Sequence, residues 1–379
     1  MGAPEELWRR LAEPARAISN AELRRWKADG GKVIGYFCSY IPPEIITAAG
    51  LLPFRMRASG STETALGDVY FANYNCTFPR HCLDMAFRGE YDFLDGLICL
   101  NNCDHLRRIY DVWESKFSTA FRHFVSVPHK SGPPQVDWYR DELAILRQRL
   151  SEHLGRDISD ASLWRAIGEH NKARRLQQEL YGLRRGDRPP VTGAQTLALV
   201  IAGTAMPVST YNALLREFLD AGGAGEAEAQ PRARLMLIGG ILDDPAYIKV
   251  IEDLGALVVT DSLCFGTRIA WREVAESGGD PLRALAQYYV GDRVHCPRMI
   301  EDYPKRLAFV REMVEAFRVD GAVLERLQFC ELWGGENFRL ARDLRASGVP
   351  ALVLEREYRL TGAGQLRTRA QAFLETIGR

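Results

Sequence analysis

The chain has 379 residues, of which 46% are hydrophobic and 26% charged, and these values are ordinary for a folded globular protein. Lys and Arg together number 49, and so do Asp and Glu, so the chain has no excess positive charge with which to hold nucleic acid or an anionic membrane. A small molecule or another protein is therefore the expected partner.

The N-terminal stretch lacks the basic region and the apolar run of a signal peptide. The most apolar run, residues 196–208, is far shorter than the roughly 20 residues that a membrane span needs. We therefore expect a cytoplasmic protein without a membrane segment. The chain has 8 cysteines, and in that setting they indicate buried thiols or metal ligands rather than a disulfide framework.

An amphipathic pattern predicts a helical segment over residues 1–30. Beyond it, short runs rich in Val, Ile and Leu alternate with helical patterns, which is typical of parallel α/β units. The predicted strands cover residues 32–37, 95–100, 234–240, 255–261, 321–329 and 350–357.

These strands fall into two groups, separated by the charge-rich residues 136–185, whose apolar residues are spaced three and four apart. We predict a helical segment there that bridges two lobes, with Asp160 capping the start of its second part. Segments rich in Gly, Pro and charge mark boundaries at 129–135, 184–193 and 220–233, of which the last is the best linker. The predicted fold is α/β, with two Rossmann-like or flavodoxin-like parallel-sheet lobes. Its segments are an N-terminal helical segment (1–30), a first α/β lobe (31–130), a helical linking segment (131–230) and a second α/β lobe (231–379).

Neither lobe has G-x-G-x-x-G after its first strand, and Gly31-Lys32 is not followed by Ser or Thr, so no P-loop is present. Ligands of parallel α/β folds gather at the carboxyl ends of the strands. Cys38, Cys103 and Cys330 each follow a predicted strand.

Cys76 precedes a Thr-Phe-Pro helix start, where the helix dipole favours a thiolate. The same setting is predicted for Cys103, with Asp104 as the helix cap. Packing is the alternative for any cysteine, and Cys82 and Cys99 are predicted to be core residues. No C-x-x-C pair supports structural zinc. If Cys76, Cys103 and Cys330 converge, three thiolates from different loops suit an iron-sulfur cluster with one open iron better than structural zinc.

Several segments resemble the catalytic subunits of 2-hydroxyacyl-CoA dehydratases and benzoyl-CoA reductases, and the resemblance covers nearly the whole chain. The matching segments are residues 38–56, 74–80, 92–113, 328–336, 348–358 and 364–375. The resemblance implies that Cys76, Cys103 and Cys330 hold a 4Fe-4S cluster. It leaves out Cys38, whose position varies in the family. Cys264 and Cys296 also resemble family positions, but the resemblance does not assign them to the cluster, and they remain reserve candidates.

The resemblance also implies two protein partners, a homologous second catalytic subunit and an ATP-hydrolysing iron-sulfur activator, and an acyl-CoA substrate. In the reductases, electrons and protons enter an aromatic ring activated by the thioester. In the dehydratases, one electron converts the thioester carbonyl to a ketyl and the 2-hydroxyl group leaves. We expect the reductase reaction. The alternatives are a dehydratase subunit, a non-catalytic electron-relay subunit, and a metal-free binding protein.

His105 and Glu331 lie next to proposed ligands and are predicted to hydrogen-bond cluster sulfur or to move protons. The alternative for both is a solvated residue at a helix start. Arg367 and Arg369, beside Gln365, suit either the phosphates of coenzyme A or a contact with a neighbouring subunit, and the sequence leaves both open.

Overall fold

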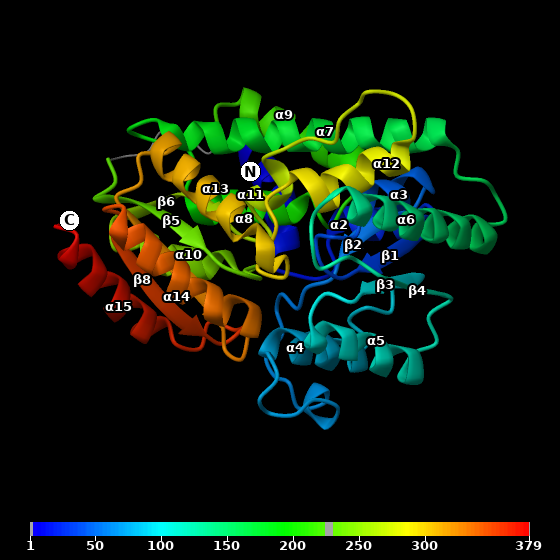
Figure 1. The fold of residues 1–379 in the computed structure, drawn as a ribbon, viewed down its shortest axis with the longest axis horizontal. Coiled ribbons are helices and arrows are strands. Elements are labelled where there is room, and N and C mark those ends of the chain that lie inside the picture. The colour runs from blue at the N-terminus through cyan, green and yellow to red at the C-terminus, as the bar shows by residue number, and fades with distance from the viewer. Residues whose placement is uncertain (1–2, 224–229, 379) are drawn as a thin grey trace.

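The computed structural model describes residues 3–223 and 230–378 and contains two four-stranded sheets, in which every pairing is parallel (Figure 1). The first sheet has the order β2-β1-β3-β4 and the second β6-β5-β7-β8, so both follow one 2-1-3-4 topology. The predicted two-lobed α/β fold is thereby confirmed. The strands are β1 (Val33–Tyr36), β2 (Leu52–Arg55), β3 (Gly96–Leu100), β4 (Phe121–Val125), β5 (Ala233–Ile238), β6 (Ala256–Ser262), β7 (Gly321–Leu327) and β8 (Ala351–Arg356).

All six predicted strands are present, but the prediction missed β2 and β4. Both are edge strands, and their sequences LPFR and FRHFV lack the continuous aliphatic run of a central parallel strand. Pro53 is tolerated in β2 because an edge strand does not need every backbone N–H for pairing. Strand β7 ends at Leu327, two residues before its predicted end, because Phe329 adopts a left-handed φ of 62°.

Each sheet is covered by helices on both faces, which accounts for its almost wholly buried central strands. Helices α4 (Thr77–Phe87) and α5 (Asp104–Lys116) cover one face of the first sheet, and α6 (Pro133–Leu154) covers the other. In the second lobe, α8 (Gly193–Ala202), α10 (Pro245–Glu252) and α15 (Ala363–Thr376) pack on one face. Helices α13 (Tyr303–Ala316) and α14 (Glu331–Ala346) pack on the other.

The predicted helix over residues 136–185 is confirmed as α6 and α7 (Asp160–Gly182). Helix α7 runs along both lobes (Figure 1) and contacts α3 (Pro43–Ala48) of the first and α11 (Thr267–Ala270) near the second. The predicted cap is wrong by one residue: Ser159 accepts the N–H of Ser162, and Asp160 is the first helical residue.

The remaining elements complete the packing around this frame. They are α1 (Ala3–Ala12), α2 (Ala21–Ala28), α9 (Val208–Asp220), α12 (Pro281–Ala286), the π-helix η4 (Gln287–Asp292) and the 3-10 turns η1 (Glu13–Ala15), η2 (Gly67–Val69), η3 (Leu183–Arg185) and η5 (Ile300–Asp302). Residues 224–229 of the predicted linker lie outside the described residues. The four segment boundaries expected from the sequence stay a proposal.

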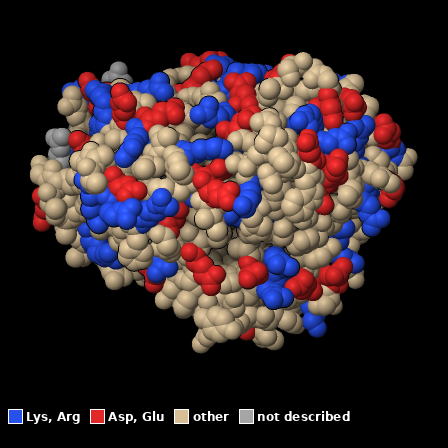
Figure 2. All heavy atoms as spheres, in the orientation of Figure 1, with Lys and Arg blue, Asp and Glu red and all other residues tan. Residues whose placement is uncertain are grey.

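The surface matches the balanced composition, since acidic and basic side chains are interspersed over the face in Figure 2. Within residues 3–223 and 230–378, no helix combines the length and the apolar character that crossing a membrane requires.

Candidate functional site between the two sheets

The shared 2-1-3-4 topology puts a switch point at the carboxyl ends of the first and third strands of each lobe, where α/β folds bind ligands. The loops after β1 and β3 and those after β5 and β7 line one cavity of about 290 Å³. The two switch points therefore face each other across a single cavity.

Six of the 8 cysteines line this cavity. They are Cys38, Cys76, Cys103, Cys264, Cys296 and Cys330. All six are free thiols. The other two, Cys82 and Cys99, are buried in the core of the first lobe, as predicted. The structure thus brings together the three predicted ligands and the three cysteines to which no role was assigned from the sequence.

Cys76, Cys103 and Cys330 each occupy the N-cap position of a helix, of α4, α5 and α14 respectively. The first backbone N–H groups of a helix have no partner within it, and its dipole favours negative charge there. The predicted capping role of Asp104 is wrong, because Asp104 is the first residue of α5 and Cys103 precedes it as the cap. At each of the three positions, the helix N-terminus therefore acts in favour of a thiolate.

Burial raises the pKa of all three thiols, to about 12 for Cys103, to about 11 for Cys330 and well above the usual value for Cys76. Neighbouring thiols raise these pKa values further, whereas backbone N–H groups of the following helix lower them. The metal-free protein consequently keeps these groups as thiols at neutral pH, and metal binding must displace their protons.

His105 and Glu331 also line the cavity, on α5 and α14. The backbone N–H of Cys76 donates to Nδ1 of His105 at 3.2 Å, so the neutral ring carries its proton on Nε2. Burial lowers the pKa of His105, although the carboxylates of Glu331 and Asp104 act in the opposite direction. His105 is therefore neutral at pH 7, and its Nε2–H is a hydrogen-bond donor.

The surroundings of the other three cysteines differ from one another. Cys38 follows β1 in a left-handed conformation, with φ of 68°. The guanidinium of Arg268 donates from Nη2 to Sγ of Cys264 at 2.9 Å. Cys296 lies between η4 and η5, with its Sγ 3.9 Å from the Tyr40 hydroxyl oxygen.

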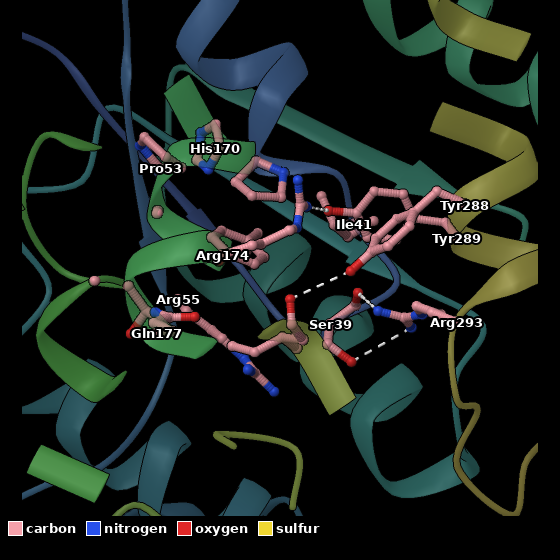
Figure 3. Close-up of a pocket in the computed structure, with 16 residues that line it drawn as sticks. Ser39, Ile41, Pro53, Arg55, His170, Arg174, Gln177, Tyr288, Tyr289 and Arg293 are labelled. Atoms are coloured by element: carbon pink, nitrogen blue, oxygen red, sulfur yellow. Dashed lines mark hydrogen bonds between the residues drawn. The ribbon is translucent and has the colours of Figure 1, made fainter. Parts of the chain in front are cut away.

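A small cavity of about 70 Å³, shown in Figure 3, shares Ser39 and Arg55 with the lining of the cysteine cavity. Arg293 donates to the carbonyl oxygen of Ser39 at 2.5 Å, and Arg55 donates from Nη1 to that of Cys264 at 2.6 Å. Nη2 of Arg55 is buried without a hydrogen-bond partner among the described residues. A buried positive charge thus faces the cysteines from this side.

Gln365 and Arg369 line a separate cavity of about 400 Å³ at the edge of the second lobe, together with Arg356 and Arg359. Arg367, from the same helix, is not among its lining residues. Recognition of coenzyme A and contact with a neighbouring subunit both stay predictions for this helix.

In the described part of the chain, no group of three or more Cys, His, Asp or Glu side chains is placed to bind a single metal ion. A cluster differs from an ion because its own iron and sulfur atoms separate its ligands. The donor set, six thiols from different loops with three at helix N-termini, fits an iron-sulfur cluster better than a mononuclear site.

Comparison with known proteins gives one family and several relatives. A family model described as "2-hydroxyglutaryl-CoA dehydratase, D-component" matches residues 38–377. A benzoyl-CoA reductase subunit of Thauera aromatica is 28% identical, over 93% of this chain and 93% of its own length. The beta subunit of (R)-phenyllactyl-CoA dehydratase from Clostridium sporogenes is 23% identical, with 94% of each chain covered. The beta subunit of (R)-2-hydroxyglutaryl-CoA dehydratase from Acidaminococcus fermentans is 25% identical, over 94% of this chain and 95% of the relative.

Proposed function

The chain belongs to the 2-hydroxyglutaryl-CoA dehydratase D-component family and is an enzyme subunit of the benzoyl-CoA reductase and 2-hydroxyacyl-CoA dehydratase type, and from this we propose that it passes low-potential electrons to an acyl-CoA thioester. The observation that carries the proposal is the convergence of three helix-capping cysteines on one cavity between the lobes.

In this proposal, Cys76, Cys103 and Cys330 hold a 4Fe-4S cluster. When bound, such a cluster supplies one-electron transfer and an iron with an open coordination position. The protein supplies three thiolates, each favoured by the N-terminus of its own helix. Their high pKa values without metal mean that loading releases protons and weakens as pH falls.

We assign hydrogen-bond donation to His105 and proton transfer to Glu331, and both face the same cavity. His105 is held by the Cys76 backbone through Nδ1 and donates a hydrogen bond from Nε2, and Glu331 at the exposed mouth takes protons from solvent and passes them inward. Phe78, Leu332 and Trp333 form apolar walls that exclude water from the reacting groups.

The reaction we propose is the reduction of an aromatic acyl-CoA, and the similarity to a benzoyl-CoA reductase subunit supports it. A 2-hydroxyacyl-CoA dehydratase subunit is the alternative, supported by the similarity to two dehydratase beta subunits. In either case, the chain works in the cytoplasm with a homologous second subunit and an ATP-hydrolysing iron-sulfur activator. A subunit that only relays electrons is a further alternative.

In the experiment, this chain is combined with its partner subunit, the activator and ATP without oxygen. Benzoyl-CoA and an (R)-2-hydroxyacyl-CoA are then added in separate reactions. We expect a ring-reduced thioester from benzoyl-CoA and no product once Cys103→Ser replaces the parent chain. An enoyl-CoA from the hydroxyacyl substrate would assign the dehydratase reaction instead. Turnover by the Cys103→Ser complex at the parent rate would contradict the proposed role of the cysteine cavity.

A further inference from the structure

We infer that the cavity of about 400 Å³ beside β8 binds a phosphate group, and that in the proposed function this group belongs to the coenzyme A part of the substrate. The coenzyme A assignment rests on the proposed function, whereas the phosphate site rests on the residues of the cavity alone. We call this space the β8 cavity. Its walls are a residue after β7, the end of β8 with the loop that follows, one residue of α10 and the first two turns of α15.

Helix α15 begins without a side-chain cap at the wall of the β8 cavity. Its N-cap is Gly362, which has no side chain to accept a hydrogen bond, and its first turn contains no acidic residue. Within the part of the chain that the structure describes, the backbone N–H groups of Ala363, Gly364 and Gln365 have no acceptor. Such N–H groups, together with the helix dipole, favour the binding of phosphate and other anions.

Three arginines line the β8 cavity from three different positions. Arg356 lies at the end of β8, Arg359 in the loop after it and Arg369 on α15. Arg359 and Arg369 each donate to one backbone carbonyl oxygen, and among residues 3–223 and 230–378 neither forms an ion pair with a carboxylate. A guanidinium group has five N–H donors in a planar fork that matches the oxygens of a phosphate. Most of these donors are therefore available to an anion.

Two carboxylates also line the β8 cavity, but they do not cancel its positive charge. Glu355 is paired with Arg326, which lies outside the lining. Arg356 is likewise paired, with the buried carboxylate of Glu325 at 2.6 Å. The two other arginines and the N-terminus of α15 are then opposed by Glu357 alone. The remaining charge of the cavity is positive and favours an anionic ligand.

A buried hydroxyl group gives an independent indication of a ligand. Tyr247 lines the cavity from α10, is only 3% exposed, and its hydroxyl is buried without a hydrogen-bond partner among the described residues. Burial and the carboxylate of Glu325 raise the pKa of Tyr247, whereas the guanidinium groups of Arg356 and Arg369 lower it, so both cations lie near the hydroxyl. A buried donor without an acceptor is unfavourable, and a phosphate oxygen beside these two arginines would supply the acceptor.

The β8 cavity adjoins the cysteine cavity at the end of β7. Leu327 lines the cysteine cavity, and the next residue, Gln328, lines the β8 cavity. The loop after β8 also contacts the first lobe, where the backbone N–H of Tyr358 donates to Oγ1 of Thr77, next to Cys76, at 3.1 Å. Coenzyme A carries its phosphates at the end opposite the thioester. Two adjoining cavities, one positive and one lined by cysteines, match the two ends of such a ligand.

The test measures binding to the full chain, purified without oxygen, by isothermal titration calorimetry. The probes are inorganic phosphate, coenzyme A, and pantetheine, which has the thiol end of coenzyme A but none of its phosphates. We expect coenzyme A to bind at least about 10-fold more tightly than pantetheine, because pantetheine lacks the charge-assisted hydrogen bonds to phosphate. Inorganic phosphate should compete with coenzyme A.

The double variant Arg359→Gln, Arg369→Gln changes two exposed side chains, so its fold should be intact. It should weaken the binding of coenzyme A by about 10-fold or more and leave that of pantetheine unchanged. Tyr247→Phe removes the buried hydroxyl and should weaken the binding of coenzyme A a few-fold. Arg367→Gln on the same helix is the matched control, because Arg367 does not line the cavity, and it should bind as the parent does.

Coenzyme A binding by the double variant at the parent affinity, in a complex that still converts an acyl-CoA, would overturn this inference and leave the proposed function intact. Loss of phosphate binding with unchanged coenzyme A binding would support the phosphate site and contradict coenzyme A as its ligand. Weaker coenzyme A binding by the double variant, when the parent complex converts neither thioester, would support the site and contradict the proposed function.

Discussion

Cys76, Cys103 and Cys330 were predictable as candidate ligands because each stands where a strand ends or a helix begins, and both positions have a physical meaning. Cys264 and Cys296 lack so clear a signal. Cys296 lies between two short helical turns and enters the cavity because Arg293 and Arg298, on either side of it, bind loops of the first lobe. Sequence spacing does not reveal such contacts.

The hydrogen-bonding role of His105 in the cavity can be separated from its structural role. Asn in its place can still accept the Cys76 N–H, but it cannot at the same time place a donor where Nε2–H of the imidazole lies. We expect His105→Asn to keep the parent iron content and spectrum and to lose about 100-fold or more in turnover. The measurement is kcat for the acyl-CoA reaction beside iron content, with Asp104→Asn on the same helix as the control.

A His105→Asn variant whose turnover stays within a few-fold of the parent would contradict a role for the Nε2–H hydrogen bond of His105 in the reaction. Equal losses of iron and activity would indicate that the histidine only positions Cys76.

At the scale of elements, the aliphatic runs correctly predicted the six more apolar strands, and the three- and four-residue spacing predicted α6 and α7. The missed strands β2 and β4 are short edge strands that contain Pro, Arg or His, so their sequences do not differ from those of loops. Both predicted caps were wrong by one residue. The helix begins as soon as the backbone becomes helical, so Asp104 and Asp160 occupy its first turn and the residue before each is the cap.

The contact between α3 and α7 predicts a pH dependence of stability. Nε2 of His170 lies 2.9 Å from Oγ1 of Thr47, and burial lowers the pKa of His170 to about 4. In the unfolded chain this histidine has an ordinary pKa of about 6.5, so it is protonated at pH values where the folded chain keeps it neutral. The free energy of unfolding therefore decreases as pH falls from about 6.5 towards 4. Between pH 6.5 and 5, His170 contributes about 2 kcal/mol to this decrease.

The check is chemical denaturation of parent and His170→Gln at pH 6.5 and 5 without oxygen. Gln keeps a hydrogen bond to Thr47 and does not titrate, so the loss of unfolding free energy should be smaller in the variant by about 2 kcal/mol. His153→Gln on α6, in the last turn of its helix, should behave as the parent does. Equal pH dependence in parent and His170→Gln would show that His170 is not the titrating group.

At the scale of the whole molecule, two lobes of the same 2-1-3-4 topology place their switch points against one cavity, and α7 runs along both lobes (Figure 1). The two-lobed fold was predictable because each lobe shows its own strand pattern. The meeting of the lobes at the cysteines was not, because it depends on contacts between residues far apart in sequence, such as Arg55 with Cys264. The family resemblance predicted that Cys76, Cys103 and Cys330 lie together, and in the structure they line one cavity.

The most direct measurement is the iron and acid-labile sulfide content of oxygen-free protein, compared between the parent and the variant Cys76→Ser, Cys103→Ser, Cys330→Ser. Removing all three helix-capping thiols should lower the iron content by about four per chain. A folded parent without iron, or a triple variant with the same iron content as the parent, would contradict the iron-sulfur site between the lobes.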